Sequence, residues 1–460
     1  MKRVYFVGIG GIGMAALARY YMATGLPVAG YDRTPSELTS ELAAAGAAVS
    51  YADSMEAIPE EYRQKEGTTV IYTPAIPADN VPLSYFRKGG FEPIKRSVAL
   101  GRITAASKGL CFSGTHGKTT TSSMAAHMLH NTATGCNAFL GGILRNYHSN
   151  LLLSPTSPYT VIEADEYDRS FHTLHPYIAV VTATDPDHLD IYGTEEAYLE
   201  SFAHFTSLVS EGGALIVHTG LKLKPRPREG VRLYTYGVES GDFHAANIRH
   251  SEGSIIFDNV ACDGHVIKDI ELGVPVEINI DNAVAAMAAV YLTGAATDEE
   301  MRTAMATFQG AERRFQFLLK EDISAGGHVV IDDYAHHPDE VRCSIESVRR
   351  LYPGRRLTVA FQPHLYTRTR DFAPQFAEAL SLADDVVLLP IYPAREEPIE
   401  GVNSEMLLKS VNCNKKQLIS KENFVNFMKD YNFEVLLALG AGDMSFMLPE
   451  LVAAIKNKIL

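Results

Sequence analysis

The stretch that most constrains the fold covers residues 110–121 and contains Gly-Thr-His-Gly-Lys-Thr-Thr at 114–120. An apolar segment precedes the two glycines, and residues 122–129 have the spacing of a helix. Glycines let the backbone approach an anion, a helix N-terminus offers free N–H groups, and a lysine adds positive charge. A hydroxyl directly after the lysine is placed to bind the Mg²⁺ that accompanies a nucleotide. The order of strand, glycine loop and helix therefore predicts an ATP site that includes Lys118 and Thr119.

This loop departs from the common phosphate-binding loop at one position. The pattern G-x-x-x-x-G-K-[ST] requires glycine at position 112, where this chain has Phe112. A solvated turn of glycine and threonine is the alternative interpretation. Lysine and threonine in the right order, between a strand and a helix, favour the ATP site.

A second glycine loop lies near the N-terminus. The apolar segment Val4–Val7 precedes the pattern G-x-G-x-x-G at 8–13, and a helical segment follows from Met14. A second strand ends at Asp32, and an acidic residue about 20 positions after the glycines is typical of a Rossmann unit. Alone, this half would indicate a nicotinamide-dependent oxidoreductase. The loop requires only a diphosphate near a helix N-terminus, however, and nucleotide sugars carry one too.

Length, charge and cysteine spacing limit the class of protein. A chain of 460 residues is long enough for about three domains. The formal net charge of −14 argues against nucleic acid as a partner. Five scattered cysteines fit a reducing compartment. The N-terminal glycines break the helix of a signal peptide, and no apolar run reaches the roughly 20 residues of a membrane span. We expect a cytoplasmic protein with no membrane partner, either a monomer or a homodimer.

Acidic and imidazole side chains follow two consecutive predicted strands in the middle of the chain. Glu163 begins an acidic cluster after one strand, and His188 follows the next strand. Ligands bind at the carboxyl edge of a parallel sheet, so these two side chains are candidates for binding a metal ion. A solvated acidic loop and a structural histidine are the alternatives.

Residues 212–273 change to short alternating strands and predict a mainly β insertion. The helix that follows carries Asn279 and Asn282 on one face of its first turn. N-capping is the ordinary role of such an asparagine.

A third α/β unit begins near Phe317. One predicted strand ends in two carboxylates and leads into Tyr334 and a pair of histidines, and a later strand leads into Arg368 and Arg370. The histidines lack the spacing of a zinc site. The arginine pair is suited to binding a carboxylate.

These segments together predict an α/β fold of three domains. An N-terminal Rossmann-like domain covers 1–105. A central ATPase domain of the P-loop type, with the mainly β insertion, covers 106–316. A C-terminal Rossmann-like domain covers 317–460.

The order of the motifs resembles the Mur ligases over nearly the whole chain. The motifs that carry the resemblance are the glycine loop 8–13, the loop 114–120, Glu163-Ala164-Asp165-Glu166, Asp187-His188, the segment 333–338, and Phe361-Gln362-Pro363-His364 with the segment 367–370. The resemblance implies a cytoplasmic, ATP-dependent ligase of peptidoglycan precursor synthesis. It would join L-alanine to the carboxylate of UDP-N-acetylmuramate through an acyl phosphate, with ATP and one or two Mg²⁺ ions. The first glycine loop would then hold uridine diphosphate, and nothing would be oxidised.

The resemblance also implies roles for individual residues. The catalytic residues would be Lys118, Glu163 and His188, and the metal ligands Thr119, Glu163 and His188. The UDP-sugar would contact Gly8, Gly10, Gly11, Ile12, Gly13, Asp32 and Thr73. ATP would contact Gly114, Thr115, His116, Gly117, Lys118, Thr119, Thr120, Asn279, Asn282, Arg314 and Asp333. L-alanine would contact Tyr334, His336, His337, His364, Arg368 and Arg370, with the arginines nearest its carboxylate.

Two departures from the family pattern matter. Many relatives carry histidine directly before the first asparagine of the adenine helix, where this chain has Ile278. No clear counterpart exists for the modified lysine that helps several relatives hold the second metal ion.

Four alternatives compete with this interpretation. A recycling ligase, which attaches the tripeptide L-Ala-γ-D-Glu-diaminopimelate to the same UDP-sugar, shares most of these motifs. A folylpolyglutamate-type ligase lacks the first Rossmann unit. A nicotinamide-dependent oxidoreductase would give no role to Lys118, Glu163 and Arg368. A non-catalytic nucleotide binder needs no carboxylates that position Mg²⁺.

Overall fold

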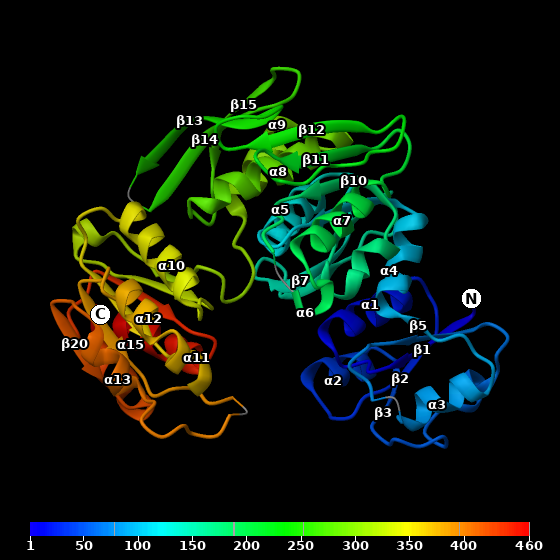
Figure 1. Ribbon diagram of the computed structural model, residues 1–460, viewed down its shortest axis with the longest axis horizontal. Coiled ribbons are helices and arrows are strands. Elements are labelled where there is room, and N and C mark those ends of the chain that lie inside the picture. The colour runs from blue at the N-terminus through cyan, green and yellow to red at the C-terminus, as the bar shows by residue number, and fades with distance from the viewer. Residues whose placement is uncertain (78, 187–188, 252, 395, 460) are drawn as a thin grey trace. The chain divides into compact units, whose positions relative to one another are not determined.

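The computed structural model describes residues 1–77, 79–186, 189–251, 253–394 and 396–459. Helices and strands alternate along much of the chain. Among the described residues the strands form three sheets, of five, ten and six strands (Figure 1). The residues group into two compact units. The first unit comprises 1–247, 258–270 and 280–307, and the second comprises 248–257, 271–279 and 308–460. The α/β fold class predicted from the sequence is confirmed.

The five-stranded sheet is formed by the first hundred residues, in the order β3-β2-β1-β4-β5. Its strands are β1 (Arg3–Val7), β2 (Val28–Tyr31), β3 (Ala48–Ser50), β4 (Thr68–Tyr72) and β5 (Ile94–Lys95). The helices are α1 (Ile12–Ala23), α2 (Glu37–Ala44), α3 (Val81–Lys88) and α4 (Arg96–Ala105). All of its strand pairs are parallel. The strands and the helix predicted around the first glycine loop are confirmed.

The central strand β1 has a core on both of its faces. Val4 and Phe6 belong to one buried apolar cluster, while Tyr5 and Val7 belong to another. Successive side chains of a strand point to opposite faces. A parallel strand covered on both sides reads as an uninterrupted apolar run, which is the pattern of Val4–Val7.

The ten-stranded sheet has the order β15-β14-β13-β12-β11-β10-β6-β9-β7-β8. Its strands are β6 (Lys108–Ser113), β7 (Asn137–Leu144), β8 (Ser149–Leu152), β9 (Tyr159–Glu163), β10 (Pro176–Val181), β11 (Ala214–His218), β12 (Arg232–Gly237), β13 (Phe243–Ser251), β14 (Ser254–Val260) and β15 (Val266–Glu271). The helices are α5 (Lys118–His130), α6 (Leu189–Tyr192), α7 (Glu195–Thr206), α8 (Ile278–Thr293) and α9 (Asp298–Thr307). A 3₁₀ helix covers Tyr167–Thr173.

The predicted mainly β segment consists of strands that continue this sheet. β11 pairs in parallel with β10, and β12 pairs in parallel with β11. At the centre, β6 lies between β9 and β10, with Phe112 opposite Glu163 and Ser113 opposite Val181. The second glycine loop therefore leaves the sheet between the two strands from which the sequence predicted metal ligands.

The six-stranded sheet belongs to the second unit and has the order β16-β17-β21-β18-β19-β20. Its strands are β16 (Gln316–Lys320), β17 (Val329–Asp333), β18 (Leu357–Phe361), β19 (Asp385–Leu388), β20 (Lys415–Leu418) and β21 (Val435–Leu439). The helices are α10 (Pro338–Leu351), α11 (Tyr366–Asp371), α12 (Ala373–Leu380), α13 (Ser404–Ser410), α14 (Phe424–Asp430) and α15 (Leu448–Ile459). β16 is antiparallel to β17, while β17, β21, β18, β19 and β20 are parallel. The polar segments that follow β17 and β18 therefore leave the sheet at the same edge.

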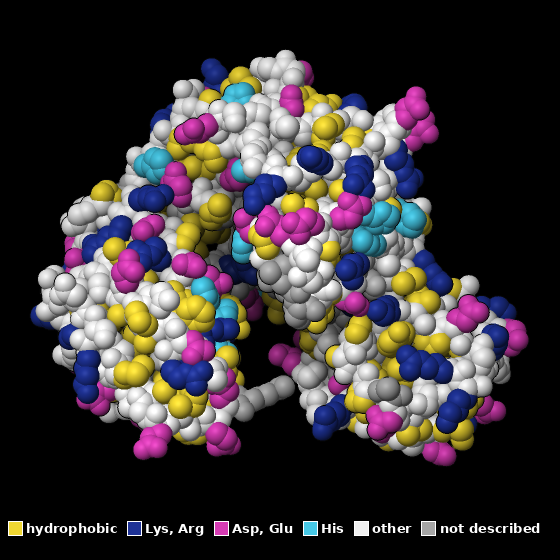
Figure 2. Space-filling model, in the orientation of Figure 1, with side chains coloured by type: hydrophobic (Ala, Val, Ile, Leu, Met, Phe, Trp, Pro, Cys, Tyr) yellow, Lys and Arg dark blue, Asp and Glu magenta, His cyan; other side chains and the backbone are white. Residues whose placement is uncertain are grey.

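Within the described residues, no helix combines the length and the apolar character that crossing a bilayer would require. Figure 2 shows acidic and basic side chains interspersed on the face drawn. The predicted domain limits at 105/106 and 316/317 lie close to the end of α4 and the start of β16, and they stay a prediction.

Candidate active site

The first glycine loop joins β1 to α1. Gly8 has φ +89°, a conformation that glycine adopts without strain, and its N–H donates to the carbonyl of Tyr31 at 2.7 Å. The N–H of Gly10 donates to Oδ2 of Asp32 at 2.7 Å. A Cβ at Gly10 would lie 2.7 Å from the methyl group of Thr39. The loop needs glycine at these two positions, and one oxygen of Asp32 is used to hold it.

The second glycine loop joins β6 to α5, as predicted. Gly114 and Gly117 have φ of +143° and +83°, and Gly117 is the N-cap of the helix. A Cβ at Gly114 would lie 2.1 Å from Oγ1 of Thr182, whose hydroxyl donates to the carbonyl of His116. The loop therefore packs against the residues that follow β10. The first helical residue is Lys118, so the free N–H groups of α5 face the loop.

The polar groups of this loop are tightly bonded. Nζ of Lys118 donates to the carbonyl of Gly114 at 2.6 Å and to Oε1 of Glu166 at 2.8 Å. The hydroxyl of Thr115 donates to the carbonyl of Asp185 at 2.7 Å and lies 2.9 Å from the hydroxyl of Tyr198. Burial raises the pKa of Glu166, and the charge of Lys118 opposes that shift.

The two predicted adenine ligands have different surroundings. Oδ1 of Asn282 accepts a hydrogen bond from the hydroxyl of Thr121 at 3.1 Å, and a Cβ at Gly117 would lie 2.7 Å from it. Asn282 thus supports the loop and α5. Nδ2 of Asn279 donates to the carbonyl of Val274 at 3.0 Å. Their roles toward adenine stay a prediction.

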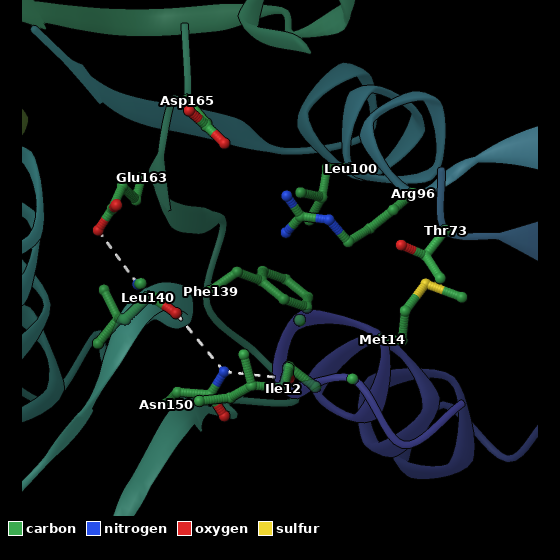
Figure 3. Close-up of a pocket in the computed structure, with 14 residues that line it drawn as sticks. Ile12, Met14, Thr73, Arg96, Leu100, Phe139, Leu140, Asn150, Glu163 and Asp165 are labelled. Atoms are coloured by element: carbon green, nitrogen blue, oxygen red, sulfur yellow. Dashed lines mark hydrogen bonds between the residues drawn. The ribbon is translucent and has the colours of Figure 1, made fainter. Parts of the chain in front are cut away.

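A cavity of about 390 Å³ opens beside the first glycine loop, within the first unit (Figure 3). Its lining combines that loop with residues from within β7 and β8 and with the end of β9. The lining residues are Gly11, Ile12, Gly13, Met14, Ala16, Thr73, Arg96, Leu100, Phe139, Leu140, Gly141, Asn150, Glu163 and Asp165. The cavity brings together Thr73 and part of the predicted UDP-sugar loop with the predicted metal ligand Glu163.

Arg96 supplies the positive charge of this cavity. It is the first residue of α4, and Figure 3 shows its guanidinium extending into the cavity above the ring of Phe139. Among the described residues, the guanidinium has no hydrogen bond or ion pair to a protein group. A Cβ at Gly13 would lie 2.7 Å from its Nη1, so glycine makes room for it. A half-buried arginine without a carboxylate partner is suited to an anionic ligand.

Two carboxylates lie on the other side of the cavity. The carboxylate of Glu163 accepts a hydrogen bond from the N–H of Gly141 at 3.1 Å. Asp165 accepts one from the N–H of Tyr167 at 3.0 Å. The side chain of Asn150 donates to the carbonyls of Ile12 and Leu140, and so links α1 to the central sheet.

The donor set fits Mg²⁺ of the kind that accompanies a nucleotide. Mg²⁺ prefers oxygen ligands and is commonly held by one or two protein groups together with phosphate oxygens and water. Thr119 is buried at the start of α5, and Glu163 lies half-buried at the end of β9. Within the described residues, no group of three or more His, Cys, Asp or Glu side chains gathers to bind a metal ion. His188, predicted as a catalytic residue and metal ligand, lies outside the described residues.

In the second unit, β17 ends in two carboxylates, of which Asp332 is buried and Asp333 is half-buried. Burial raises the pKa of Asp332 to about 7, while the charge of Arg313 opposes the shift. Burial also raises the pKa of Asp333, whose carboxylate accepts hydrogen bonds from the hydroxyl of Ser344 and the N–H of Phe315. Arg314, predicted to act with Asp333, carries a charge that lowers that pKa. Their contact with the nucleotide stays a prediction.

Four of the residues predicted to bind the amino acid form one cluster. The rings of Tyr334 and His336 pack edge to face with centroids 5.0 Å apart, and the rings of His336 and His364 are 5.9 Å apart. Nδ1 of His364 and Nη1 of Arg368 are buried and have no hydrogen-bond partner among the described residues. Burial lowers the pKa of His364, and the charge of Arg368 lowers it further. Orphaned polar atoms of this kind indicate that a polar ligand completes the site.

The other two residues predicted for this pocket have partners of their own. The N–H of His337 donates to Glu340 at 3.1 Å at the start of α10, and its ring packs on Phe372. Arg370 is exposed and forms an ion pair with Asp371 at 2.7 Å. The structure thus separates Arg368, inside the cluster, from Arg370 at the surface.

Sequence reasoning missed several residues at these sites. Glu166 ends the acidic segment that follows β9, Arg96 begins α4, and no local pattern distinguishes either residue. Tyr392 stacks on His364 with centroids 5.7 Å apart, and Glu396 accepts hydrogen bonds from Thr367. Arg313, next to the predicted Arg314, lies over the ring of Tyr334 at 4.7 Å. These contacts join segments that are distant in the sequence.

The structure has three mainly parallel sheets that are combined with helices, and glycine loops follow strands of the first two sheets. One cavity contains both a glycine loop and carboxylates. These features define a multidomain α/β enzyme that uses nucleotides. Three family models match the chain in series: the Mur ligase catalytic domain over 3–108, the Mur ligase middle domain over 112–290, and the glutamate ligase domain of Mur ligases over 313–444. The chain belongs to the Mur ligase family.

Named relatives are similar over the full length. A protein of Phocaeicola vulgatus named UDP-N-acetylmuramate–L-alanine ligase is 55% identical over 100% of this chain and 99% of its own length. One with the same name from Parabacteroides distasonis is 56% identical over 96% and 94%. Among solved structures, a UDP-N-acetylmuramate–alanine ligase of Thermotoga maritima matches with a TM-score of 0.76 and 26% identity, covering 99% of both chains. A murein peptide ligase of Psychrobacter arcticus shares the fold, with a TM-score of 0.62 and 19% identity over 99% of both chains.

Proposed function

We propose that this chain is a cytoplasmic, ATP-dependent ligase that joins L-alanine to the carboxylate of UDP-N-acetylmuramate in peptidoglycan precursor synthesis. The observation that carries the proposal is the cavity that the first glycine loop and Glu163 share. In this cavity the glycine loop that we expect to hold a diphosphate lies together with a carboxylate at the end of β9, a strand next to β6 and the second glycine loop. The substrates are those in the names of the relatives that match the full chain. Domains 1–105, 106–316 and 317–460 would bind the UDP-sugar, ATP and the amino acid in turn.

The first glycine loop and Arg96 would hold the UDP-sugar. The backbone N–H groups at the start of α1 and the guanidinium of Arg96 attract negative charge. Asp32 would act by keeping the loop in shape through Gly10. Its other oxygen accepts a long hydrogen bond from the N–H of Thr34, at 3.4 Å, and would have acceptor capacity left for the nucleoside. The muramoyl end of the substrate would then extend along the cavity toward Glu163 and Asp165.

The reaction consists of two transfers. An oxygen of the muramoyl carboxylate attacks the γ-phosphorus of ATP, and the bond from that phosphorus to ADP breaks. The amine of L-alanine then attacks the acyl carbon, phosphate leaves, and the nitrogen loses a proton. Such transfers depend on positioning and on neutralisation of charge. Lys118 would contact the β- and γ-phosphates. Mg²⁺, held by Thr119 and Glu163 with His188 at a second ion, would supply further positive charge.

The cluster in the second unit would bind L-alanine. Nη1 of Arg368 is buried and lacks a hydrogen-bond partner among the described residues, and this guanidinium would contact the carboxylate of the amino acid. Burial and the charge of that arginine lower the pKa of His364, which favours the neutral imidazole. Tyr334 and His336 complete the cluster.

Phosphate release from Mg-ATP tests this proposal. The full chain is incubated with UDP-N-acetylmuramate and either L-alanine or the tripeptide L-Ala-γ-D-Glu-diaminopimelate. Release that requires L-alanine, with UDP-N-acetylmuramoyl-L-alanine as the product, is the expected result. Release only with the tripeptide would identify the recycling reaction. Release with neither acceptor would overturn the proposal.

A further inference from the structure

Glu166 is buried behind the second glycine loop and is paired with Lys118. Its side chain is 2% exposed, and Oε1 lies 2.8 Å from Nζ of the lysine. Oε2 is buried and has no hydrogen-bond partner among the described residues. Removing a carboxylate from water costs free energy unless a charged partner lies close to it. Lys118 is therefore the group that compensates for the burial of this carboxylate.

Two of the three N–H groups of the Lys118 ammonium are bound firmly. One donates to the carbonyl of Gly114 at 2.6 Å, and another donates to Glu166. The third has only a long contact with the carbonyl of Thr115, at 3.4 Å. An ammonium has three donors. The two short bonds fix the position of Nζ, and they leave the third N–H for a phosphate oxygen.

Two tyrosines that contact each other support the segments that carry Glu166 and Lys118. The hydroxyl of Tyr192 donates to the backbone carbonyl of Glu166, and the guanidinium of Arg169 lies over the ring of Tyr192 at 4.8 Å. The ring of Tyr198 packs edge to face on that of Tyr192 with centroids 4.8 Å apart, and its hydroxyl contacts Thr115 of the glycine loop. The two tyrosines thus connect the segment after β9 to the loop before α5.

We propose that Glu166 is a positioning residue for ATP. It acts by holding the ammonium of Lys118 in place beside the second glycine loop. This inference rests on the proposed function, because it requires ATP at this loop. Glu166 itself contacts neither phosphate nor metal ion. A carboxylate that competed with phosphate for the lysine would have the opposite effect, since its removal would tighten nucleotide binding.

Calorimetric binding of Mg²⁺ with a non-hydrolysable ATP analogue tests the proposal in the full-length protein. The variants are Glu166→Ala, Glu166→Gln, Lys118→Ala and the double variant Lys118→Ala with Glu166→Ala. Glu200→Gln is the matched control, because Glu200 also pairs with a basic side chain, Arg226, but lies exposed on α7. Thermal melting of each variant shows whether it is folded, and Glu166→Gln keeps the shape of the side chain if Glu166→Ala does not fold.

Glu166→Ala should weaken analogue binding and lower kcat/KM for ATP by about 10- to 100-fold, since displacement of a positioned group by about 1 Å has effects of this size. KM for L-alanine should not change, and Glu166→Gln, which keeps one acceptor oxygen, should lose less. In the Lys118→Ala background, the loss of Glu166 should have no further effect. Glu200→Gln should bind like the unmodified protein.

Three results would overturn the inference while the proposed function stands: binding by Glu166→Ala within about twofold of the unmodified protein, tighter binding, or losses that add in the double variant. Failure of the unmodified protein to bind the analogue would overturn the proposed function, and this inference with it.

Discussion

The carboxylate of Glu163 accepts a hydrogen bond from the backbone N–H of Gly141 across a distance of 3.1 Å. A Cβ at position 141 would lie 2.3 Å from Oε2 of Glu163, closer than non-bonded atoms approach. Only glycine therefore allows the carboxylate to stand at this place. β7 thus fixes the position of a candidate metal ligand that belongs to β9.

Gly141→Ala should displace Glu163 and impair phosphoryl transfer. We expect kcat to fall by about 10- to 100-fold, with a higher Mg²⁺ concentration needed for half-maximal activity. Steady-state rates measured across a Mg²⁺ titration check this expectation. Glu163→Gln should shift the Mg²⁺ requirement in the same direction. An unchanged requirement in Gly141→Ala would show that the contact does not position a metal ligand.

Arg96→Ala should weaken binding of the UDP-sugar. A charged hydrogen bond to phosphate or carboxylate contributes about 1.5–3 kcal/mol, so KM for UDP-N-acetylmuramate should rise by about 10- to 100-fold. KM for ATP should change little. Arg102→Ala is the matched control, because Arg102 lies exposed on the same helix. Equal effects of the two substitutions would contradict the assignment of Arg96 to this site.

Arg368 and Arg370 should differ in their effect on the amino acid. Arg368→Ala removes the guanidinium whose buried Nη1 has no hydrogen-bond partner among the described residues, and it should raise KM for L-alanine by about 10-fold or more. Arg370→Ala breaks an exposed ion pair with Asp371 and should raise KM by less. Steady-state kinetics with varied L-alanine measure both. A larger effect at Arg370 would place the carboxylate of the amino acid outside the cluster.

We expect the free energy of unfolding of the first unit to fall at mildly acidic pH because of the buried His127. Nδ1 lies 2.7 Å from the hydroxyl of Tyr147 and Nε2 lies 3.1 Å from that of Thr307. Burial lowers the pKa of His127 from 6.5 to about 4. Between these pH values the unfolded chain binds the extra proton, so stability is fully present above pH 6.5 and falls as the pH drops toward 4.

The slope from this residue is at most about 1.4 kcal/mol per pH unit. Urea unfolding at pH 7.0 and 5.0 measures it, and His127→Gln should lose less stability between the two than the unmodified protein does. His148→Asn is the control, because His148 is exposed and asparagine tolerates its φ of +50°. An unchanged pH dependence in His127→Gln would contradict the prediction.

Local patterns predicted much of this protein correctly. The apolar segments before the two glycine loops, at Val4–Val7 and at Leu110–Phe112, are strands. The two glycine loops lie between a strand and a helix. Such features depend on the conformations of neighbouring residues and on periodic burial, which a sequence displays directly. In the second unit, Arg313 lies over the ring of Tyr334, a contact that no local pattern indicates.

By itself, the sequence determined the α/β class, the two glycine loops between a strand and a helix, and the order of the polar clusters. Only the tertiary structure decided which of these side chains meet. β6 pairs between β9 and β10, and this order brings Glu166 to Lys118, 48 positions earlier in the chain. In the same way, the start of α4 directs Arg96 into the cavity that Glu163 lines. The pairing of strands is set by long-range burial of apolar surface, and no local pattern of residues records its outcome.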